Sequence, residues 1–578
     1  SIRLSGYHPV LQQLLFNRGI DSREQAEQYL AASTPPDSDP AGMVGINEAV
    51  DRINRAITNG EKVAVYGDFD VDGVTATALL TEVLNSIGAD VEGYIPNRFD
   101  EGYGLNHEAL TELREQGKSL IITVDCGIRS PDEVEHAKKL GLDVIISDHH
   151  QPGSELPDAL AIINPKQASD SYPYKDLAGV GLAYKLASAL TGPDHPAVQQ
   201  SLDLVALGTV ADLAPLVEEN RALVRAGLYR IREPHRQGLR SLMGVARVNP
   251  NRITAGDIGY ILGPRLNAAG RLDTAYAALE LLMARDVALA AKLAQMLDNQ
   301  NRERQQITRA IQKHAETKAL ADDPQAVLLF ASDPDYNMGV IGLAASRLTE
   351  KYYRPAIVAC RGEDVTRGSC RSIKEFHITD ALDQCRDLLI RHGGHAAAAG
   401  FTVKTENLSE LKDRLLSIAM GQLGDLDLRP KLKADMEIPL SELKPEILEY
   451  IERLDSSLEE INSGSAAISS IIRSVDEAAG KSAVSALHMN NSMAQIRERN
   501  VEISKFSEAS RLGVARLQRS MRDASDGLSQ FRIEPEVALP ESATANPEEL
   551  EPIGAASRVY LEEDMSALEA AEQTRASV

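Results

Sequence analysis

The sequence predicts an α/β protein: a parallel-sheet domain joined by a long helix to a second, smaller α/β domain. From about residue 45 to 215, short apolar runs alternate with amphipathic stretches, which is typical of a parallel sheet covered by helices on both faces. The same alternation returns from about 325 to 440. At 578 residues, the chain is also too long for a single hydrophobic core.

Composition and breaker residues divide the chain into six expected regions. They are a helical lead-in at 1–44, the parallel-sheet domain at 45–215, a helical region with a long connecting helix (about 286–315) at 216–320, the second α/β domain at 321–453, a helical extension at 454–532, and an acidic disordered tail at 533–578. The second domain is expected to have strands at 326–330 and 356–359. In the extension, Ile461, Ile468 and Val475 fall seven apart, a spacing typical of coiled coils.

Bulk composition excludes several classes of protein. No apolar run approaches the length that spans a bilayer, and the first residues lack the pattern of a secretion signal. The four cysteines show no paired spacing, which fits a reducing cytoplasm. The net charge of -24 argues against a protein coated by polyanion. It leaves a nucleic-acid substrate open, because local basic grooves and bound cations supply that affinity.

Acidic and imidazole side chains stand at the ends of the predicted strands of the first domain. The runs 63–66, 120–124 and 144–146 are each followed by such residues, and a helical segment at 207–212 ends in another. Because ligands collect at the carboxyl ends of strands in an open α/β sheet, we expect these side chains to converge. The candidates are Asp68, Asp70, Asp72, Asp125, Asp148, His149, His150 and Asp212.

This set of side chains predicts a two-metal phosphoesterase. Mg²⁺ and Mn²⁺ prefer carboxylate oxygens, and Mn²⁺ also accepts imidazole. Two such ions about 3.5–4 Å apart can activate a water and stabilise the leaving oxygen of a phosphodiester. Asp125 is the expected bridge, while Asp70 and Asp72 would each reach a different ion.

The remaining candidates have more than one expected role. Asp68 is either a ligand or orients the other two aspartates, and His149 is a direct ligand. His150 either binds metal or contacts the scissile phosphate, and Asp212 completes the ligand set. An aspartate at a strand end can instead cap the next helix, which is the simpler explanation for Asp68 alone. The absence of His-Glu-x-x-His and of a Walker loop argues against a zinc protease and an ATPase.

Four motifs in this region resemble those of the DHH phosphoesterase superfamily. They are Gly-Asp-Phe-Asp-Val-Asp-Gly at 67–73, Val-Asp-Cys-Gly at 124–127, Ser-Asp-His-His at 147–150 and Gly-Thr-Val-Ala-Asp at 208–212. Flanking segments at 95–98, 102–105, 179–181 and 263–271 narrow the resemblance to the RecJ-type single-strand DNA exonucleases. The second domain resembles the DHHA1 domain of that family through 339–348, 368–373 and 393–401, so that the resemblance covers about residues 1–453.

The resemblance implies a 5′-to-3′ exonuclease of DNA repair and recombination, which releases mononucleotides from single-stranded DNA with Mn²⁺ or Mg²⁺, two ions in all. It implies that metal is held by Asp70, Asp72, Asp125, His149 and Asp212, with His150 beside the phosphate. It also implies that the DNA is held by Arg98, Arg271, Arg371, Ser372, Gly394 and His395. For each arginine, a role in a structural or domain-interface ion pair is an equally good explanation. Tyr66 stands where some relatives have histidine, so one of the two metal sites could lack a ligand that those relatives have.

The resemblance ends where an OB-fold is expected. Residues 456–532 show no alternating strands and few aromatic residues, and 493–531 weakly resemble the signalling helices of chemotaxis receptors. We therefore expect weaker binding of long strands, and a possible protein partner for this helical region. Two other functions stay open: hydrolysis of short oligonucleotides or cyclic dinucleotides, and a non-catalytic replication scaffold.

Overall fold

The computed structural model describes residues 4–97, 104–272, 274–321, 323–437 and 532–535. The chain divides into two compact units. The larger unit consists of Glu27–Asp425 with Ser457–Glu459, and the smaller unit contains Ser1–Ala26, Leu426–Ser456 and Glu460–Val578. None of the helices in the described ranges combines the length and the apolar character that crossing a bilayer requires.

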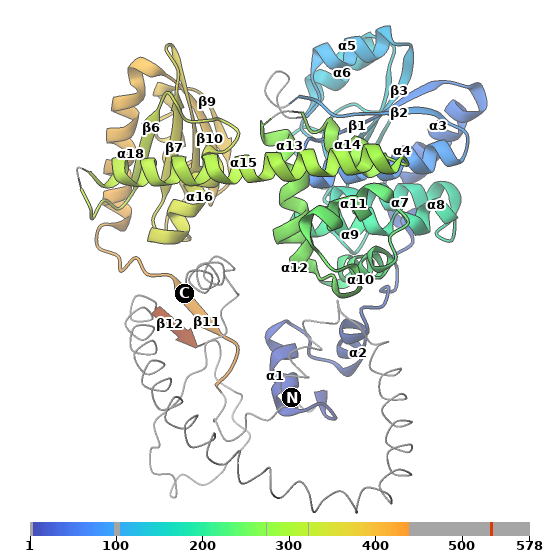
Figure 1. The fold of residues 1–578 in the computed structure, drawn as a ribbon, viewed down its shortest axis with the longest axis horizontal. Helices are drawn as coiled ribbons and strands as arrows, with labels where there is room; N and C mark the ends of the chain where they lie inside the picture. The colour runs from blue at the N-terminus through green and yellow to red at the C-terminus, as the bar shows by residue number, and fades with distance from the viewer. Residues whose placement is uncertain (1–3, 98–103, 273, 322, 438–531, 536–578) are drawn as a thin grey trace, which may run out of the picture. The chain divides into compact units, whose positions relative to one another are not determined.

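The larger unit begins with a five-stranded, all-parallel sheet in the order β2-β1-β3-β4-β5 (Figure 1). The strands are β1 (Lys62–Gly67), β2 (Asp90–Tyr94), β3 (Lys118–Val124), β4 (Asp143–Ser147) and β5 (Ala161–Ile163). The helices before and between them are η2 (Pro40–Gly42), α3 (Ile46–Asn59), α4 (Val71–Ser86), α5 (His107–Glu115) and α6 (Pro131–Lys139). The strand β3 is thus central, with β1 and β4 on its two sides.

Alternate residues of these strands enter two separate cores. Val63 and Val65 of β1 pack in one core with residues of α4, whereas Ala64 and Tyr66 pack in the other with residues of α5 and α6. Successive side chains of a strand point to opposite faces, so both faces of this sheet are covered by helices. The predicted parallel sheet is confirmed.

A helical region follows the sheet. It consists of α7 (Gly179–Thr191), α8 (Pro196–Gln200), α9 (Leu202–Ala211), α10 (Glu218–Arg232), α11 (Gln237–Ala246), η3 (Pro250–Arg252), α12 (Ala255–Asp257), the π-helical turn η4 (Ile258–Leu262), α13 (Gly263–Leu272), α14 (Tyr276–Met283) and α15 (Val287–Leu320). The predicted long helix is α15. It begins where expected because the Asp286 carboxylate caps it, accepting a hydrogen bond from the Leu289 amide at 2.8 Å.

A second five-stranded sheet follows α15, in the order β6-β7-β8-β10-β9. Its elements are β6 (Leu329–Asp333), α16 (Ile341–Tyr352), β7 (Ala356–Arg361), β8 (Val365–Arg371), α17 (Ile378–Asp383), η5 (Arg386–Leu388), β9 (Leu389–Gly394), β10 (Ala398–Lys404), η6 (Thr405–Asn407) and α18 (Leu408–Leu423). The sheet is mixed: β6 pairs with β7 in parallel, and the other pairs are antiparallel.

The prediction of a strand at 326–330 was wrong by three residues, since β6 begins at Leu329. The ladder opens with the Leu329 amide donating to the Pro355 carbonyl at 2.8 Å, and Leu329 pairs with Ala356. Pro355 has no amide hydrogen and cannot extend the ladder backward. The apolar run therefore starts before the pairing does.

The smaller unit contains the first lead-in helix, α1 (Pro9–Asn17), while the second, α2 (Arg23–Ala31), crosses its boundary. It also contains a parallel pair of short strands, β11 (Lys431–Ala434) and β12 (Arg532–Pro535). The sequence patterns did not predict β12. The rest of the proposed helical extension and acidic tail, 454–531 and 536–578, lies outside the described residues.

Candidate metal centre

The candidate ligands gather at the carboxyl ends of the three middle strands of the first sheet. Asp70 is the N-cap of α4, just after β1, and its Oδ1 accepts from the amides of Asp72 and Gly73 at 2.9 and 3.1 Å. Asp125 follows β3, and His149 follows β4. Parallel strands bring these ends to one edge of the sheet. Asp212 joins them from the C-cap of α9.

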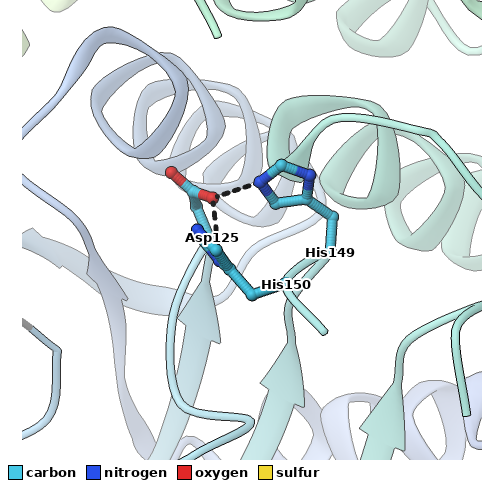
Figure 2. Close-up of side chains that lie close together, drawn as sticks. All are labelled: Asp125, His149 and His150. Carbon is cyan, nitrogen blue, oxygen red and sulfur yellow. Dashed lines mark ion pairs between the residues drawn. The ribbon is translucent and has the colours of Figure 1, made fainter. Parts of the chain in front are cut away.

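Three overlapping sets of side chains have ligand atoms within 4.8 Å of one another among the described residues. They are Asp125, His149 and His150; Asp72, His149 and Asp212; and Asp68, Asp70 and Asp125. The His149 Nε2 atom lies 3.1 Å from Asp125 Oδ1, 3.7 Å from Asp212 Oδ2 and 3.9 Å from Asp72 Oδ2. In Figure 2, dashed lines join the Asp125 carboxylate to both imidazoles. Asp125 and His149 each belong to two sets.

The N-terminus of α7 holds the Asp72 side chain in place. The amides of Gly179 and Val180 donate to its two carboxylate oxygens at 2.7 and 2.8 Å. Burial nevertheless raises the pKa of Asp72 to about 7, and repulsion from Asp212 and Asp70 adds to the rise. Burial and the nearby Asp70 likewise raise the pKa of Asp212 to about 7. Neither carboxylate is easily ionised without a cation beside it.

Asp125 has the most constrained position in the cluster. Its backbone is left-handed, with φ 62°, a conformation that costs a non-glycine residue energy and is often found at functional sites. Burial raises the pKa of its carboxyl well above the usual range, and the charges of Asp72, Asp70 and Asp68 raise it further. Asp125 Oδ1 and His149 Nε2 are both buried without a hydrogen bond to any described residue.

These atoms fit a divalent cation. An octahedral Mg²⁺ with bonds of 2.0–2.1 Å places neighbouring ligand atoms about 3 Å apart, close to the 3.1 Å between Asp125 Oδ1 and His149 Nε2. Burial lowers the pKa of His149, so its imidazole is neutral, as a metal ligand must be. A cation would also offset the repulsion among the carboxylates.

His150 differs from His149 in its partner and its exposure. Its Nδ1 lies 2.7 Å from Asp148 Oδ1, and Asp148 Oδ2 accepts from the Ile128 amide at 2.9 Å. Burial alone would lower the pKa of His150, but the hydrogen bond to Asp148 and the negative charges of Asp148, Asp212 and Asp70 together outweigh it and raise that pKa. The His150 side chain is 44% exposed, against 13% for His149. A half-buried imidazole whose protonated form is favoured suits contact with an anion.

Tyr66 lies outside the cluster. It is fully buried in the core beneath α5 and α6, and its hydroxyl donates to the Gly104 carbonyl at 3.0 Å and accepts from Asn106 Nδ2 at 3.0 Å. Asp68, two residues later, is the side chain that joins Asp70 and Asp125.

The residues expected to hold DNA lie in several places. Arg98 is outside the described residues. Arg271, at the end of α13, donates to the Gly339 carbonyl at 3.4 Å. Arg371, at the end of β8, donates to Ser369 Oγ and to the Cys370 carbonyl at 3.2 and 2.8 Å. Burial lowers the pKa of Arg371, and no ion pair to it is recorded in the described part of the chain.

The other three candidates, Ser372, Gly394 and His395, lie in the second domain. The Ser372 hydroxyl donates to the Phe376 carbonyl at 2.7 Å, which commits its proton. Gly394 has φ 149°, and a Cβ there would lie 2.3 Å from the Ala398 carbonyl oxygen, so that only glycine fits. His395 is exposed beside it.

Sequence reasoning missed how two glycines make room for the carboxylates. A Cβ on Gly179 would lie 2.6 Å from Asp125 Cβ, and one on Gly208 would lie 2.8 Å from Asp72 Oδ1. Gly208 stands inside α9, where glycine is unfavourable. A glycine inside a predicted helix was the sequence signal that could have shown this close approach.

We expect Gly179→Ala to lower phosphodiesterase activity about a hundredfold, because the new methyl group displaces Asp125 and small misplacements at a reacting centre are costly. The matched control is Gly181→Ala in the same helix, whose Cβ would meet only the Leu177 side chain, at 3.4 Å. Steady-state rates of both variants with Mn²⁺ check this. Equal rates for the two would contradict the tight fit at Asp125.

Comparison with known proteins assigns the family. The model of the DHH family, N-terminal domain, matches residues 62–209, and that of the DHHA1 domain matches 324–420. The single-stranded-DNA-specific exonuclease RecJ of Salmonella typhimurium is 37% identical over 466 residues, which cover 77% of this chain and 80% of that protein. The chain belongs to the RecJ family.

Similarity to other RecJ proteins supports this assignment. RecJ of Bacillus subtilis is 42% identical over 450 residues, and the match covers 77% of this chain but 57% of that longer protein. The crystal structure of Thermus thermophilus RecJ in complex with Mn²⁺ is 32% identical with a TM-score of 0.67, and covers 78% of this chain and 64% of that one. The same protein has been solved in complex with Mg²⁺. The expected order of a DHH and then a DHHA1 domain is confirmed.

Proposed function

We propose that this protein is a metal-dependent exonuclease that degrades single-stranded DNA from its 5′ end to mononucleotides, in DNA repair and recombination. The observation that carries the proposal is the buried pair of Asp125 Oδ1 and His149 Nε2, 3.1 Å apart, inside three overlapping ligand sets. The proposed substrate is that of its RecJ relatives, which are named single-stranded-DNA-specific exonucleases. The polarity rests on family resemblance.

Six residues would hold two divalent ions, Mn²⁺ or Mg²⁺. The set Asp72, His149 and Asp212 suits one ion and the set Asp68, Asp70 and Asp125 the other, with Asp125 near enough to His149 to touch both. When bound, such ions supply an activated water and charge stabilisation at the phosphate. The structure of T. thermophilus RecJ with Mn²⁺ supports the choice of metal.

The protein's own side chains would orient the DNA. His150, whose protonated form Asp148 favours, would donate from its ring to a phosphate oxygen next to the scissile bond. The Arg371 guanidinium, the Gly394 amide and His395 hold the 5′ end, together with Arg98, Arg271 and Ser372 as the family pattern implies. Glycine at 394 allows the DNA backbone to approach closely.

The four cysteines, Cys126, Cys360, Cys370 and Cys385, are all unpaired. Free thiols suit a reducing compartment, so the proposed location is the cytoplasm. A protein partner for the C-terminal helical extension remains part of the proposal and is not needed for the chemistry.

The deciding experiment uses single-stranded DNA that carries a label at either its 5′ or its 3′ end, with Mn²⁺. We expect the 5′ label to be released first, as a mononucleotide, and we expect no release by Asp125→Ala. Early release of the 3′ label would contradict the polarity. Cleavage confined to very short oligonucleotides would favour the alternative hydrolase, and intact DNA under all conditions would favour a scaffold.

A further inference from the structure

The buried face of the long helix α15 changes from apolar to polar in its middle. At one end Leu293 and Leu297 pack inward, and at the other end Ile311 and Ala315 do so. Between them the same face, continued in steps of three and four residues, carries Asn301, Arg304 and Thr308. Figure 1 shows α15 running from α13 and α14 to α16 and β6, so this polar stretch lies between the two domains of the larger unit.

Two of these polar groups lack the partners that burial demands. Asn301 is 1% exposed, and neither its Oδ1 nor Arg304 Nε makes a hydrogen bond to any described residue. Thr308 only donates to the Arg304 carbonyl of its own helix, at 2.7 Å. An unmade hydrogen bond of this kind is destabilising, and more so when the group is charged. The helix therefore carries polar groups here that the described part of the chain leaves without hydrogen bonds.

The charges of two further arginines, on neighbouring helices, act on Arg304. Burial lowers the pKa of Arg304, and the positive charges of Arg347 on α16 and Arg265 on α13 lower it further. Arg265 Nε lies 2.9 Å from Asp298 Oδ1, and the same carboxylate also pairs with Arg302 at 2.6 Å. No ion pair is recorded for Arg304 or Arg347 within the described ranges. Positive charge therefore exceeds negative charge around Arg304.

The helix α13 connects this stretch to the metal centre. Asn267, two residues after Arg265, accepts a hydrogen bond from the Val71 amide at 3.2 Å, directly after Asp70. A Cβ on Gly270 of the same helix would lie 2.8 Å from the Phe69 carbonyl oxygen, so α13 packs closely on the turn that carries Asp68 and Asp70. One helix thus contacts the ligand turn and also supplies Arg265.

We propose that Arg304, with Arg347 and Arg265, binds a phosphodiester group of the single strand at a site separate from the metal ligands and from the residues that hold the 5′ end. This inference rests on the proposed function. A planar guanidinium group binds phosphate through two parallel hydrogen bonds. One bound phosphate would accept hydrogen bonds from Arg304 and offset the repulsion among the three cations. A purely structural cluster would be expected to contain matching carboxylates, and among the described residues the ion pairs of these three arginines involve Asp298 alone.

The test measures DNA binding by the full-length protein in EDTA, so that no cleavage occurs. Arg304→Gln is compared with Arg309→Gln, which removes the same charge from an exposed position of the same helix. We expect Arg304→Gln to weaken binding of a long oligo(dT), followed by fluorescence anisotropy, about tenfold or more. The slope of log affinity against log salt concentration should fall by about 0.7, the value for one phosphate contact on a single strand. Arg309→Gln should change neither quantity.

Thermal stability separates binding from a structural role. Arg304→Gln removes like-charge repulsion, so its melting temperature should match or exceed that of the unchanged protein, whereas a structural cation would lower it. If Arg304→Gln matches Arg309→Gln in both affinity and slope, the inference is wrong. Should Arg304→Gln fail to fold, Arg347→Gln is judged by the same criteria.

The outcome is independent of catalysis. Loss of binding in Arg304→Gln together with no cleavage by the unchanged protein would support the phosphate site and contradict the proposed function. Normal cleavage by the unchanged protein, together with unchanged DNA binding by Arg304→Gln, would support the proposed function and contradict the phosphate site. An unchanged protein that binds no single strand would overturn both.

Discussion

Asp125→Asn is expected to abolish cleavage of single-stranded DNA and, at the same time, to raise the melting temperature of the metal-free protein. The carboxylate is buried, lies 3.1 Å from His149 Nε2, and belongs to two of the three ligand sets. Losing a ligand near both ions removes several kcal/mol of stabilisation at the phosphate, so the rate should fall at least about a thousandfold. The amide keeps the shape of the side chain and cannot ionise, whereas burial and the charges of Asp72, Asp70 and Asp68 disfavour the ionised carboxylate at this position.

Activity with Mn²⁺ and calorimetry in EDTA measure the two effects on one preparation. Asp90→Asn is the control, because it removes an exposed carboxylate at the amino end of β2, the opposite end of the same sheet. A variant that retains a tenth of the activity would exclude Asp125 as a shared ligand. A lowered melting temperature in EDTA would mean that the carboxylate has a structural partner.

The metal-free protein is expected to lose stability as the pH rises through the range in which Asp72 and Asp212 ionise. Both have pKa values raised to about 7 in the folded chain, against about 3.9 for an unfolded aspartate. The folded state then holds these protons more tightly than the unfolded state. The resulting stabilisation is complete below about pH 4 and is lost as the pH rises to about 7.

Mn²⁺ should reverse this trend, because metal binding needs ionised carboxylates and releases their protons. The rise in melting temperature caused by Mn²⁺ should therefore be larger at about pH 8 than at about pH 5, by several degrees. Asp212→Asn is the control for the titration of all other groups, because it lacks only the carboxyl of Asp212. In EDTA, the difference between its melting temperature and that of the unchanged protein should therefore increase with pH. A Mn²⁺ effect that does not vary with pH would contradict the proposed ligands.

The strand ends could be predicted from sequence because the signal there is local. An apolar run such as 144–146 fixes a buried strand, and the next residues must then lie at the sheet edge. The convergence of Asp70, Asp125 and His149 follows from parallel topology, which the alternating pattern already indicates. Asp212, at the C-cap of α9, joins them through the packing of that helix on α4.

The remaining features depend on contacts between distant parts of the chain. The amides of Gly179 and Val180 bind Asp72 from 107 and 108 residues away. The start of β6 depends on Pro355 in its partner strand, and the Tyr66 hydroxyl is directed to Gly104 by packing beneath α5. No local pattern contains this information. The polar stretch of α15 is periodic and visible in sequence, but its missing partners are visible only in the folded chain.

The distribution of ligands along the chain has a consequence for protein synthesis. Asp212 is the C-cap of α9, and α9 packs on α4, which carries Asp72. A nascent chain that has emerged from the ribosome only as far as the residues just after β4 holds Asp70, Asp125 and His149 but lacks the last carboxylate. Domains fold largely as units during translation. Nuclease competence therefore arises late and in one step, after the parallel sheet and its helical cover have assembled.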